Sequence, residues 1–363
     1  MRRVVIGTTA ISMALAVAAC GKAGDDKSDS GDKTSSGGDK SIGLLLPDSV
    51  TTRYAKFDKP YFDAKVKELC SDCTLEYANA AGSAATQAQQ VSSMITKGVK
   101  VIAISAVDSA AIKSSIQAAV DKGIKVVAYD RLAQGPVSAY VSFDNAKVGE
   151  LQGQALLDAM GAKATPKAKV VMINGLASDP NAALFKSGAH KVLDSKVDIA
   201  YEQAGDWDAG VAAQKMSAAI TQLGAKNIAG VYAANDAMAG GIATVLKGKN
   251  ISSTPLTGQD AELTGIQRIV AGTQSSTIYK AYKPEADGAA ELAVNLLQGK
   301  SIDSIATSTE TSGSGDKVPS LLLPPVSLTK ANIKDTVVKD GLYTVAEICT
   351  GEFAAACKTA GLQ

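Results

Sequence analysis

Short apolar runs and amphipathic segments alternate through the first half of the chain. The runs are of the kind that form buried parallel strands, and the segments between them repeat apolar positions at the period of a helix. Strictly alternating strands and helices are typical of a doubly wound parallel sheet. The pattern predicts strands over 41–46, 73–78, 99–105 and 124–129, separated by helices over 57–69, 84–97 and 110–122.

The same alternation continues through the second half. Residues 307–317 are polar and predict a loop, whereas 320–328 are strand-like. Because Pro324 and Pro325 lack an amide hydrogen, this last segment can occupy only an edge or a crossover. The remaining pattern predicts helices over 147–160, 181–193, 210–223, 236–247, 263–271 and 284–297, and strands over 169–174, 198–204, 228–233, 254–258 and 277–279.

These patterns predict an α/β protein of two doubly wound, Rossmann-like lobes joined by crossover hinge strands. At 363 residues the chain is long enough for two domains of ordinary size. Two such lobes leave a cleft between the carboxyl ends of their strands, where ligands bind. We expect the N-terminal lobe to comprise 41–142 plus 281–318, the C-terminal lobe 143–280 plus 319–345, and a tail 346–363.

The start of the chain has the pattern of a targeting segment and a tether. A basic start precedes an apolar stretch too short to span a bilayer, which predicts a signal peptide over 1–19. Residues 17–20, Val-Ala-Ala-Cys, resemble the lipobox of bacterial lipoproteins, in which Cys20 is lipidated; cleavage that leaves a free Cys20 is the alternative. Residues 20–40 predict a flexible linker. We therefore expect export and anchoring to the outer face of the cell membrane.

Four further cysteines, Cys70, Cys73, Cys349 and Cys357, suit two disulfides in an exported chain. Three pairings are possible, and we favour the local one, Cys70 with Cys73 and Cys349 with Cys357. The spacing of the second pair does not match a zinc site. The first pair follows a predicted helix rather than a strand, which disfavours a thioredoxin-like redox site.

Composition and missing motifs argue against several function classes. The formal net charge of +1 gives no reason to expect a nucleic acid partner. His190 is the single histidine, so a histidine-based triad or an HExxH zinc site has little to work with. The Gly-Lys-Ser run at 299–301 follows a predicted helix, so it is not a P-loop. We expect no cofactor, no metal and no catalytic residue.

Polar or aromatic side chains follow strand after strand at the predicted carboxyl edges. Taken singly, Asp236 or Asn145 could be a helix cap, and Trp207 could be core. Carboxylates among them could hold a metal, but Arg131 and Lys280 would oppose a cation. A purely structural sheet has no need of such side chains at successive strand ends, so we interpret them as a ligand site. The set comprises Asp130, Arg131, Asn145, Trp207, Asn235, Asp236, Asp260 and Lys280.

Sugar binding is the chemistry that fits this set. A sugar hydroxyl both donates and accepts, so a carboxylate can take its proton while an arginine, lysine or asparagine donates to its oxygen. Hydrogen bonds to charged partners contribute about 1.5–3 kcal/mol each. Trp207 would cover the apolar face of the ring, and the fixed fork of Arg131 can serve two neighbouring hydroxyls.

Motifs around these residues resemble the periplasmic sugar-binding proteins that feed ABC importers, of the ribose and galactose type. They include Ala-Tyr-Asp-Arg at 128–131, Ser-Phe-Asp-Asn at 142–145, Ala-Asn-Asp-Ala at 234–237 and Gly-Gln-Asp-Ala-Glu at 258–262. The resemblance covers 41–345 and implies the type I periplasmic-binding-protein fold, in a monomeric, non-enzymatic receptor that closes over one monosaccharide. It implies ligand contacts by Arg53, Asp130, Arg131, Asn145, Trp207, Asn235, Asp236, Asp260 and Lys280.

The resemblance also implies a sugar and a partner. The expected sugar is an aldopentose, D-xylose before glucose, ribose or galactose, and the expected partner is the permease of an ABC transporter. Tyr54 stands where this family usually has a tryptophan, and 179–181 read Asp-Pro-Asn rather than Asp-Asn-Asn. We include Tyr54 and Asn181 among the sugar contacts, and either departure can shift the preference among aldoses. A sensor that reports to a membrane signalling protein is the alternative.

Overall fold

The structure, a computed structural model, describes residues 40–362. The predicted signal peptide over 1–19, the lipidation at Cys20 and nearly all of the linker over 20–40 lie outside these residues. Within 40–362, no helix has both the length and the apolar composition that crossing a membrane requires.

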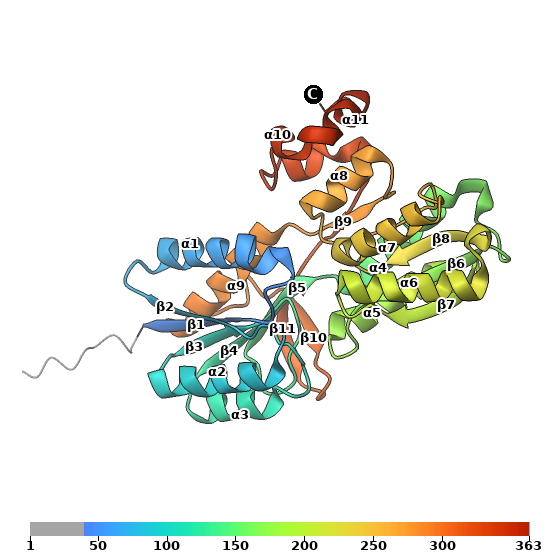
Figure 1. Cartoon of the computed structure of the whole chain (residues 1–363). Helices are drawn as coiled ribbons and strands as arrows, with labels where there is room; N and C mark the ends of the chain where they lie inside the picture. The colour runs from blue at the N-terminus through green and yellow to red at the C-terminus, as the bar shows by residue number, and fades with distance from the viewer. Residues whose placement is uncertain (1–39, 363) are drawn as a thin grey trace, which may run out of the picture. The chain divides into compact units, whose positions relative to one another are not determined.

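A seven-stranded sheet forms the N-terminal lobe, with the strand order β10-β11-β5-β4-β3-β1-β2 (Figure 1). Neighbouring strands pair in parallel, except that β10 is antiparallel to β11. The strands are β1 (Ser41–Leu46), β2 (Thr74–Asn79), β3 (Val101–Ile104), β4 (Lys125–Tyr129), β5 (Ala139–Phe143), β10 (Ser308–Thr311) and β11 (Lys317–Leu323).

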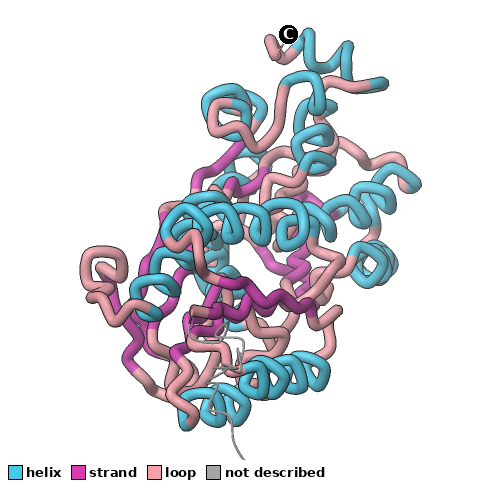
Figure 2. The backbone as a smooth tube through the Cα atoms, turned by 90° about the vertical axis from the view of Figure 1, so that its left-hand side faces the viewer, coloured by secondary structure: helices cyan, strands magenta, loops and turns pink. Residues whose placement is uncertain are grey.

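Helices cover both faces of this sheet (Figure 2). Side chains alternate between the faces along a strand, so Leu44 and Leu46 pack under α1 and α9, whereas Leu45 packs under α2 and α3. Both faces are therefore apolar, which explains the uninterrupted apolar runs in the sequence. These helices are α1 (Lys59–Leu69), α2 (Ala84–Lys97), α3 (Lys113–Asp121) and α9 (Tyr282–Leu297).

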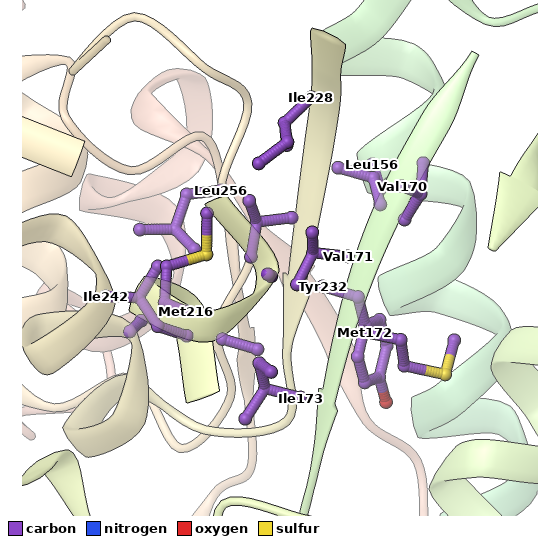
Figure 3. Close-up of a cluster of buried hydrophobic side chains, with 14 of the residues drawn as sticks. Leu156, Val170, Val171, Met172, Ile173, Met216, Ile228, Tyr232, Ile242 and Leu256 are labelled. Atoms are coloured by element: carbon purple, nitrogen blue, oxygen red, sulfur yellow. The ribbon is translucent and has the colours of Figure 1, made fainter. Parts of the chain in front are cut away.

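The C-terminal lobe is built on a parallel sheet of order β7-β6-β8, beside a two-stranded antiparallel pair of β9 and β12. Figure 3 shows Leu156 of α4 beside Val170, while Met216 and Ile242 of α6 and α7 lie across the strand with Ile173. The elements are α4 (Asn145–Met160), β6 (Lys169–Asn174), α5 (Pro180–Leu193), β7 (Asp198–Ala204), α6 (Ala209–Leu223), β8 (Ile228–Ala233), α7 (Asp236–Gly248), α8 (Leu263–Ala271), β9 (Thr277–Tyr279) and β12 (Val326–Leu328).

The described chain passes between the lobes at three places: between β5 and α4, between β9 and α9, and between β11 and β12. Pro324 and Pro325 lie in the third passage, so the expected crossover position of this segment is confirmed. The large sheet continues to Leu323, beyond the boundary expected at 318.

Two predicted elements differ from the structure. Residues 254–258 form no strand; they meet β8 through a single bridge between Leu256 and Val231, and Gly258 lies close against the carboxylate of Asp236. The polar segment 307–317 is not all loop, since it contains β10, whose side chains alternate between half-buried and exposed. A polar sequence of this kind is typical of an edge strand that must avoid aggregation.

The C-terminal residues pack against α8. Cys349 and Cys357 form a disulfide there, and Cys70 and Cys73 form a second, so both local pairings match the sequence-based preference. The short helices are η1 (Tyr54–Asp58), η2 (Gly161–Lys163), η3 (Ala225–Asn227), η4 (Lys330–Asn332), η5 (Lys334–Val338), α10 (Val345–Ile348), η6 (Gly351–Phe353) and α11 (Ala354–Thr359).

Candidate functional site

One cavity is lined by residues from both lobes and from the passage between β9 and α9. The contributing segments are the turn before α1, the end of β4, the starts of α5, α6 and α7, and the turn before α8. All of these are strand ends or helix starts, where a doubly wound fold places ligands. The lining residues are Thr51, Arg53, Tyr54, Asp130, Arg131, Asp179, Asn181, Phe185, Trp207, Asn235, Gln259, Asp260 and Lys280.

Three of these residues have a left-handed backbone that non-glycine residues rarely adopt. Their φ angles are 60° at Asp130, 62° at Trp207 and 90° at Asp260. Such conformations cost of the order of 1–3 kcal/mol each and persist only where the surroundings over-determine them. At Asp130 these surroundings include two hydrogen bonds that fix the backbone: its carbonyl accepts from the hydroxyls of Tyr140 and Ser142, at 3.1 and 2.7 Å.

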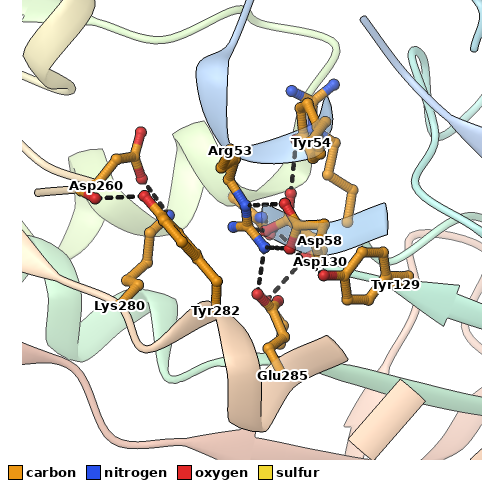
Figure 4. A network of polar contacts seen from close by, with 12 residues as sticks. Arg53, Tyr54, Asp58, Tyr129, Asp130, Asp260, Lys280, Tyr282 and Glu285 are labelled. Atoms are coloured by element: carbon orange, nitrogen blue, oxygen red, sulfur yellow. Dashed lines mark hydrogen bonds and ion pairs between the residues drawn. The ribbon is translucent and has the colours of Figure 1, made fainter. Parts of the chain in front are cut away.

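Arg53 lies at the centre of a buried cluster of charges (Figure 4). Its guanidinium donates twice to Asp58, at 2.8 Å each, donates to Glu285, and pairs with Asp130 at 3.4 Å. The hydroxyl of Tyr54 donates to the other oxygen of Asp130 at 2.8 Å. The guanidinium and the carboxylate of Asp130 therefore face the cavity in a fixed relative orientation.

Burial and charge set the pKa values of this cluster. Burial raises the pKa of Glu285 to about 8, so this carboxyl carries a proton at neutral pH. Burial also acts to raise the pKa of Asp130, but the charges of Arg53, Lys280 and Arg131 hold it below its usual range. Of these two carboxyl groups, the one that lines the cavity, that of Asp130, is therefore the ionised one.

A second ion pair, Lys280 with Asp260, lies on the cavity lining. The ammonium of Lys280 is 2.7 Å from Asp260, and the hydroxyl of Tyr282 donates to the Asp260 carbonyl (Figure 4). On the cavity lining, the indole N–H of Trp207 and the amide oxygen of Gln259 are two buried atoms for which the described residues provide neither a hydrogen bond nor an ion pair. A buried polar atom without a partner costs about 1–3 kcal/mol, so these two atoms mark positions where a ligand would be stabilised.

The aromatic side chains shape one wall. Phe185 and Trp207 meet edge to face, with centroids 6.2 Å apart. A side chain at Gly175 would come within 2.0 Å of the Trp207 ring, so glycine is required for this close approach. The wall gives the polar cavity an apolar surface suited to C–H groups.

Direct contacts join the lobes across the cleft. The guanidinium of Arg131 lies 2.8 Å from Asp179, and the side-chain amide of Asn181 donates to the carbonyl of Asp130 at 2.9 Å. Arg131 and Asp130 follow β4 in one lobe, whereas Asp179 and Asn181 begin α5 in the other. The structure is thus that of a closed cleft.

The periplasmic binding protein domain profile matches residues 42–301 of the chain. The chain belongs to the periplasmic binding protein family. It is 38% identical over 315 residues to the D-xylose-binding periplasmic protein of Escherichia coli, covering 85% of this chain and 92% of that protein. It is 33% identical over 287 residues to the multiple sugar-binding periplasmic receptor ChvE of Rhizobium radiobacter, covering 72% and 80%.

Solved structures agree with this assignment. A carbohydrate transporter solute-binding protein from Chloroflexus aurantiacus in complex with D-glucose has a TM-score of 0.74 at 28% identity, covering 84% of this chain and 97% of that one. An ABC transporter solute-binding protein from Clostridium phytofermentans with β-D-glucose has a TM-score of 0.76 at 26% identity, covering 85% and 100%. The predicted type I periplasmic-binding-protein fold is therefore confirmed, and the family is one of binding proteins rather than enzymes.

This periplasmic binding protein brings most of the sequence-predicted residues together on its cavity. Two of the predicted residues, Asn145 and Asp236, are not on the lining. The side chain of Asn145 lies behind the lining, where it donates to Ser142 and to the side-chain oxygen of Asn181. The carboxylate of Asp236 points away from the cavity into a set of protein donors. Those found on the lining are Arg53, Tyr54, Asp130, Arg131, Asn181, Trp207, Asn235, Asp260 and Lys280.

The binding protein also uses residues that the sequence did not single out. Gln259 and Asp179 lie in the segments 258–262 and 179–181, which the sequence analysis had already singled out, whereas Phe185 lies four residues beyond the second segment. Asp58 and Glu285 orient Arg53, yet they lie in helical segments with no local indication of that role.

Proposed function

We propose that this chain is an extracytoplasmic receptor that captures one monosaccharide, D-xylose in first place, by closing its two lobes over the sugar. The observation that carries the proposal is one cavity between the two lobes, lined by charged and amide side chains from both lobes and by the aromatic side chains of Phe185 and Trp207. The relatives named for D-xylose binding, from Escherichia coli and Haemophilus influenzae, support the choice of sugar.

The cavity supplies both halves of hydroxyl recognition. Asp130 and Asp260 accept, whereas Arg131, Lys280 and the amide of Asn235 donate, so one hydroxyl can be bonded as donor and acceptor at once. A sugar contacting Asp130 in one lobe and Asp260 in the other stabilises the closed form by its differential contacts. Trp207 and Phe185 cover the ring, and the indole N–H gains its missing partner.

Other aldoses form the alternative. Two relatives are named as multiple sugar-binding proteins, and two similar solved structures hold glucose, a hexose. Glucose differs from xylose by one hydroxymethyl group, so the preference depends on the space beside the aromatic wall. Isothermal titration calorimetry with D-xylose, D-glucose, D-ribose and D-galactose tests the proposal: tightest binding of D-xylose supports it, and binding of none of the four refutes sugar capture.

Delivery completes the proposed function. We propose that the receptor acts as a monomer, is tethered through lipid at Cys20, and hands its sugar to the permease subunits of an ABC transporter. Replacing Cys20 by serine should release the protein from the membrane fraction without changing its affinity in calorimetry. A variant that stays membrane-bound would contradict the anchor, and uptake of labelled xylose that persists after deletion of the receptor would contradict the delivery role. A sensor would instead leave uptake unchanged and abolish a sugar-dependent signal.

A further inference from the structure

Asp236 is fully buried at the first position of α7 and lies outside the cavity lining. Its carboxylate accepts hydrogen bonds from three segments far away along the chain: the backbone N–H of Glu262 at 2.9 Å, the hydroxyl of Thr277 at 2.9 Å and the side-chain amide of Gln274 at 2.6 Å. Its own backbone N–H donates to the carbonyl of Gln259 at 2.9 Å. Both carboxylate oxygens and the backbone N–H of Asp236 are therefore hydrogen-bonded within the protein.

Two glycines enclose the same carboxylate. A Cβ atom at Gly258 would lie 1.9 Å from Oδ1 of Asp236, and one at Gly265 would lie 2.4 Å from its carboxyl carbon. Neither position can carry a side chain unless the carboxylate moves. The protein thus encloses Asp236 from both sides, and no sugar hydroxyl can reach it.

The turn held by Asp236 is the one that carries Gln259 and Asp260 onto the cavity. Its backbone is strained, with φ angles of 90° at Asp260 and 50° at Ala261. Strain of this kind persists only where contacts on both sides impose it. Asp236 bonds the carbonyl of Gln259 before the strained pair and the N–H of Glu262 after it, so it clamps both ends of the turn.

We propose that Asp236 is a positioning residue, which holds the 259–262 turn so that Asp260, paired with Lys280, presents its carboxylate to the sugar. This inference rests on the proposed sugar-binding function and assigns Asp236 an indirect part in it. Thr277 supports the same turn, because its hydroxyl also accepts from the N–H of Ala261 at 3.2 Å while it donates to Asp236.

An asparagine side chain in place of Asp236 cannot take over this role. If its amide oxygen lay on the Glu262 and Thr277 side, its NH₂ group would face the NH₂ group of Gln274. Gln274 cannot turn over, because its oxygen already accepts from Arg268 at 2.9 Å. If the amide lay the other way round, its NH₂ group would face two donors instead. Either orientation removes at least one clamp from the turn.

The test compares Asp236→Asn with Met216→Ala. Met216 is fully buried in the C-terminal lobe but away from the cavity, so it is a control for lost stability alone. We expect Asp236→Asn to weaken D-xylose binding by about tenfold or more, the size of one lost charge-assisted hydrogen bond. The Met216→Ala control should lower the melting temperature while leaving the dissociation constant unchanged. An Asp236→Asn variant that binds D-xylose as tightly as wild type overturns the proposal.

A double-mutant cycle with Asp260→Asn separates positioning from an independent effect. If Asp236 acts through Asp260, the double variant should bind no more weakly than Asp260→Asn alone. Losses in affinity that multiply would overturn the inference. If Asp236→Asn does not fold, Thr277→Val carries the test, because it removes one donor to Asp236 and should weaken binding in the same direction.

Amide hydrogen exchange makes the inference testable without any ligand. In the sugar-free protein, Asp236→Asn should speed the exchange of the Glu262 amide, whose hydrogen bond it breaks, relative to Met216→Ala. Unchanged exchange would overturn the role of Asp236 in the turn, whatever the ligand. Wild-type protein that binds no sugar would instead refute the proposed function, while the exchange result would still decide what Asp236 does.

Discussion

Replacing Glu285 by glutamine should raise the free energy of unfolding, relative to wild type, more at pH 7 than at pH 5. Glu285 is fully buried, and its carboxyl contacts the guanidinium of Arg53 beside Asp58 and Asp130. Burial raises its pKa to about 8 from an ordinary value of 4.5. The folded protein therefore holds a proton at pH 7 that the unfolded chain has released.

The size of the effect follows from this difference. Because the pKa is raised in the fold, its stabilising contribution is complete below pH 4.5 and is lost as the pH rises through 8. Each pH unit between these values changes the free energy of unfolding by about 1.4 kcal/mol, so about 3 kcal/mol is lost at pH 7. Glutamine does not titrate and avoids this loss. Oε1 of Glu285 lacks a hydrogen-bond partner among the described residues, so an unsatisfied amide there would cost about 1–3 kcal/mol.

Chemical denaturation at pH 5 and at pH 7 measures the difference. The free energy of unfolding of Glu285→Gln, minus that of wild type, should increase by about 2–3 kcal/mol between the two pH values. This change is independent of the constant cost of the amide. Glu291→Gln is the matched control, because Glu291 lies on the same helix and its partly exposed carboxylate pairs with Lys65. The same difference at both pH values would refute a protonated Glu285.

Three further perturbations test other parts of the structure. Asp179→Asn removes the negative charge that lies 2.8 Å from the guanidinium of Arg131 across the cleft, so the open form should gain population and sugar affinity should fall about tenfold. Small-angle scattering of the sugar-free protein should then show a larger radius of gyration, and an unchanged radius would contradict this. Trp207→Ala should weaken sugar binding in calorimetry by about tenfold, because the ring loses its aromatic cover; unaltered affinity would show that the indole does not contact the sugar. Replacing Cys349 and Cys357 by serine removes a disulfide that closes a loop with a sequence separation of 8, and should lower the free energy of unfolding, measured by calorimetry, by about 2–3 kcal/mol. An unchanged free energy of unfolding would show that the C-terminal residues do not stabilise the fold through their packing on α8.

Much of the site was predictable because it follows from local sequence and topology. Apolar runs identify buried strands, and the carboxyl ends of parallel strands meet at one edge of a sheet. A side chain directly after such a run therefore lies near the cleft in any doubly wound fold. Asp130 and Arg131 follow the parallel strand β4 in this way, and both line the cavity. Lys280 also lines the cavity, but it follows β9, whose partner β12 is antiparallel, so this rule does not account for its position.

The two residues at the start of α7 show where that reasoning ends. Asn235 and Asp236 are adjacent and equally polar, yet Asn235 lines the cavity while Asp236 is enclosed by Gly258 and Gly265. Proximity to a strand end places both near the cleft. Their directions depend on the turn before α8, which folds back from more than twenty residues further along the chain.

The charge cluster around Arg53 could not be predicted from local sequence either. Glu285 is 232 residues from Arg53 in sequence, and nothing in its own helix distinguishes it from a surface glutamate. The sequence by itself determined the alternation of strands and helices, the two lobes and the polar strand ends, because periodicity is a property of neighbouring residues. Only the tertiary structure decided which carboxyls face the cavity and which hold other side chains in place, because that depends on donors and charges contributed by distant segments.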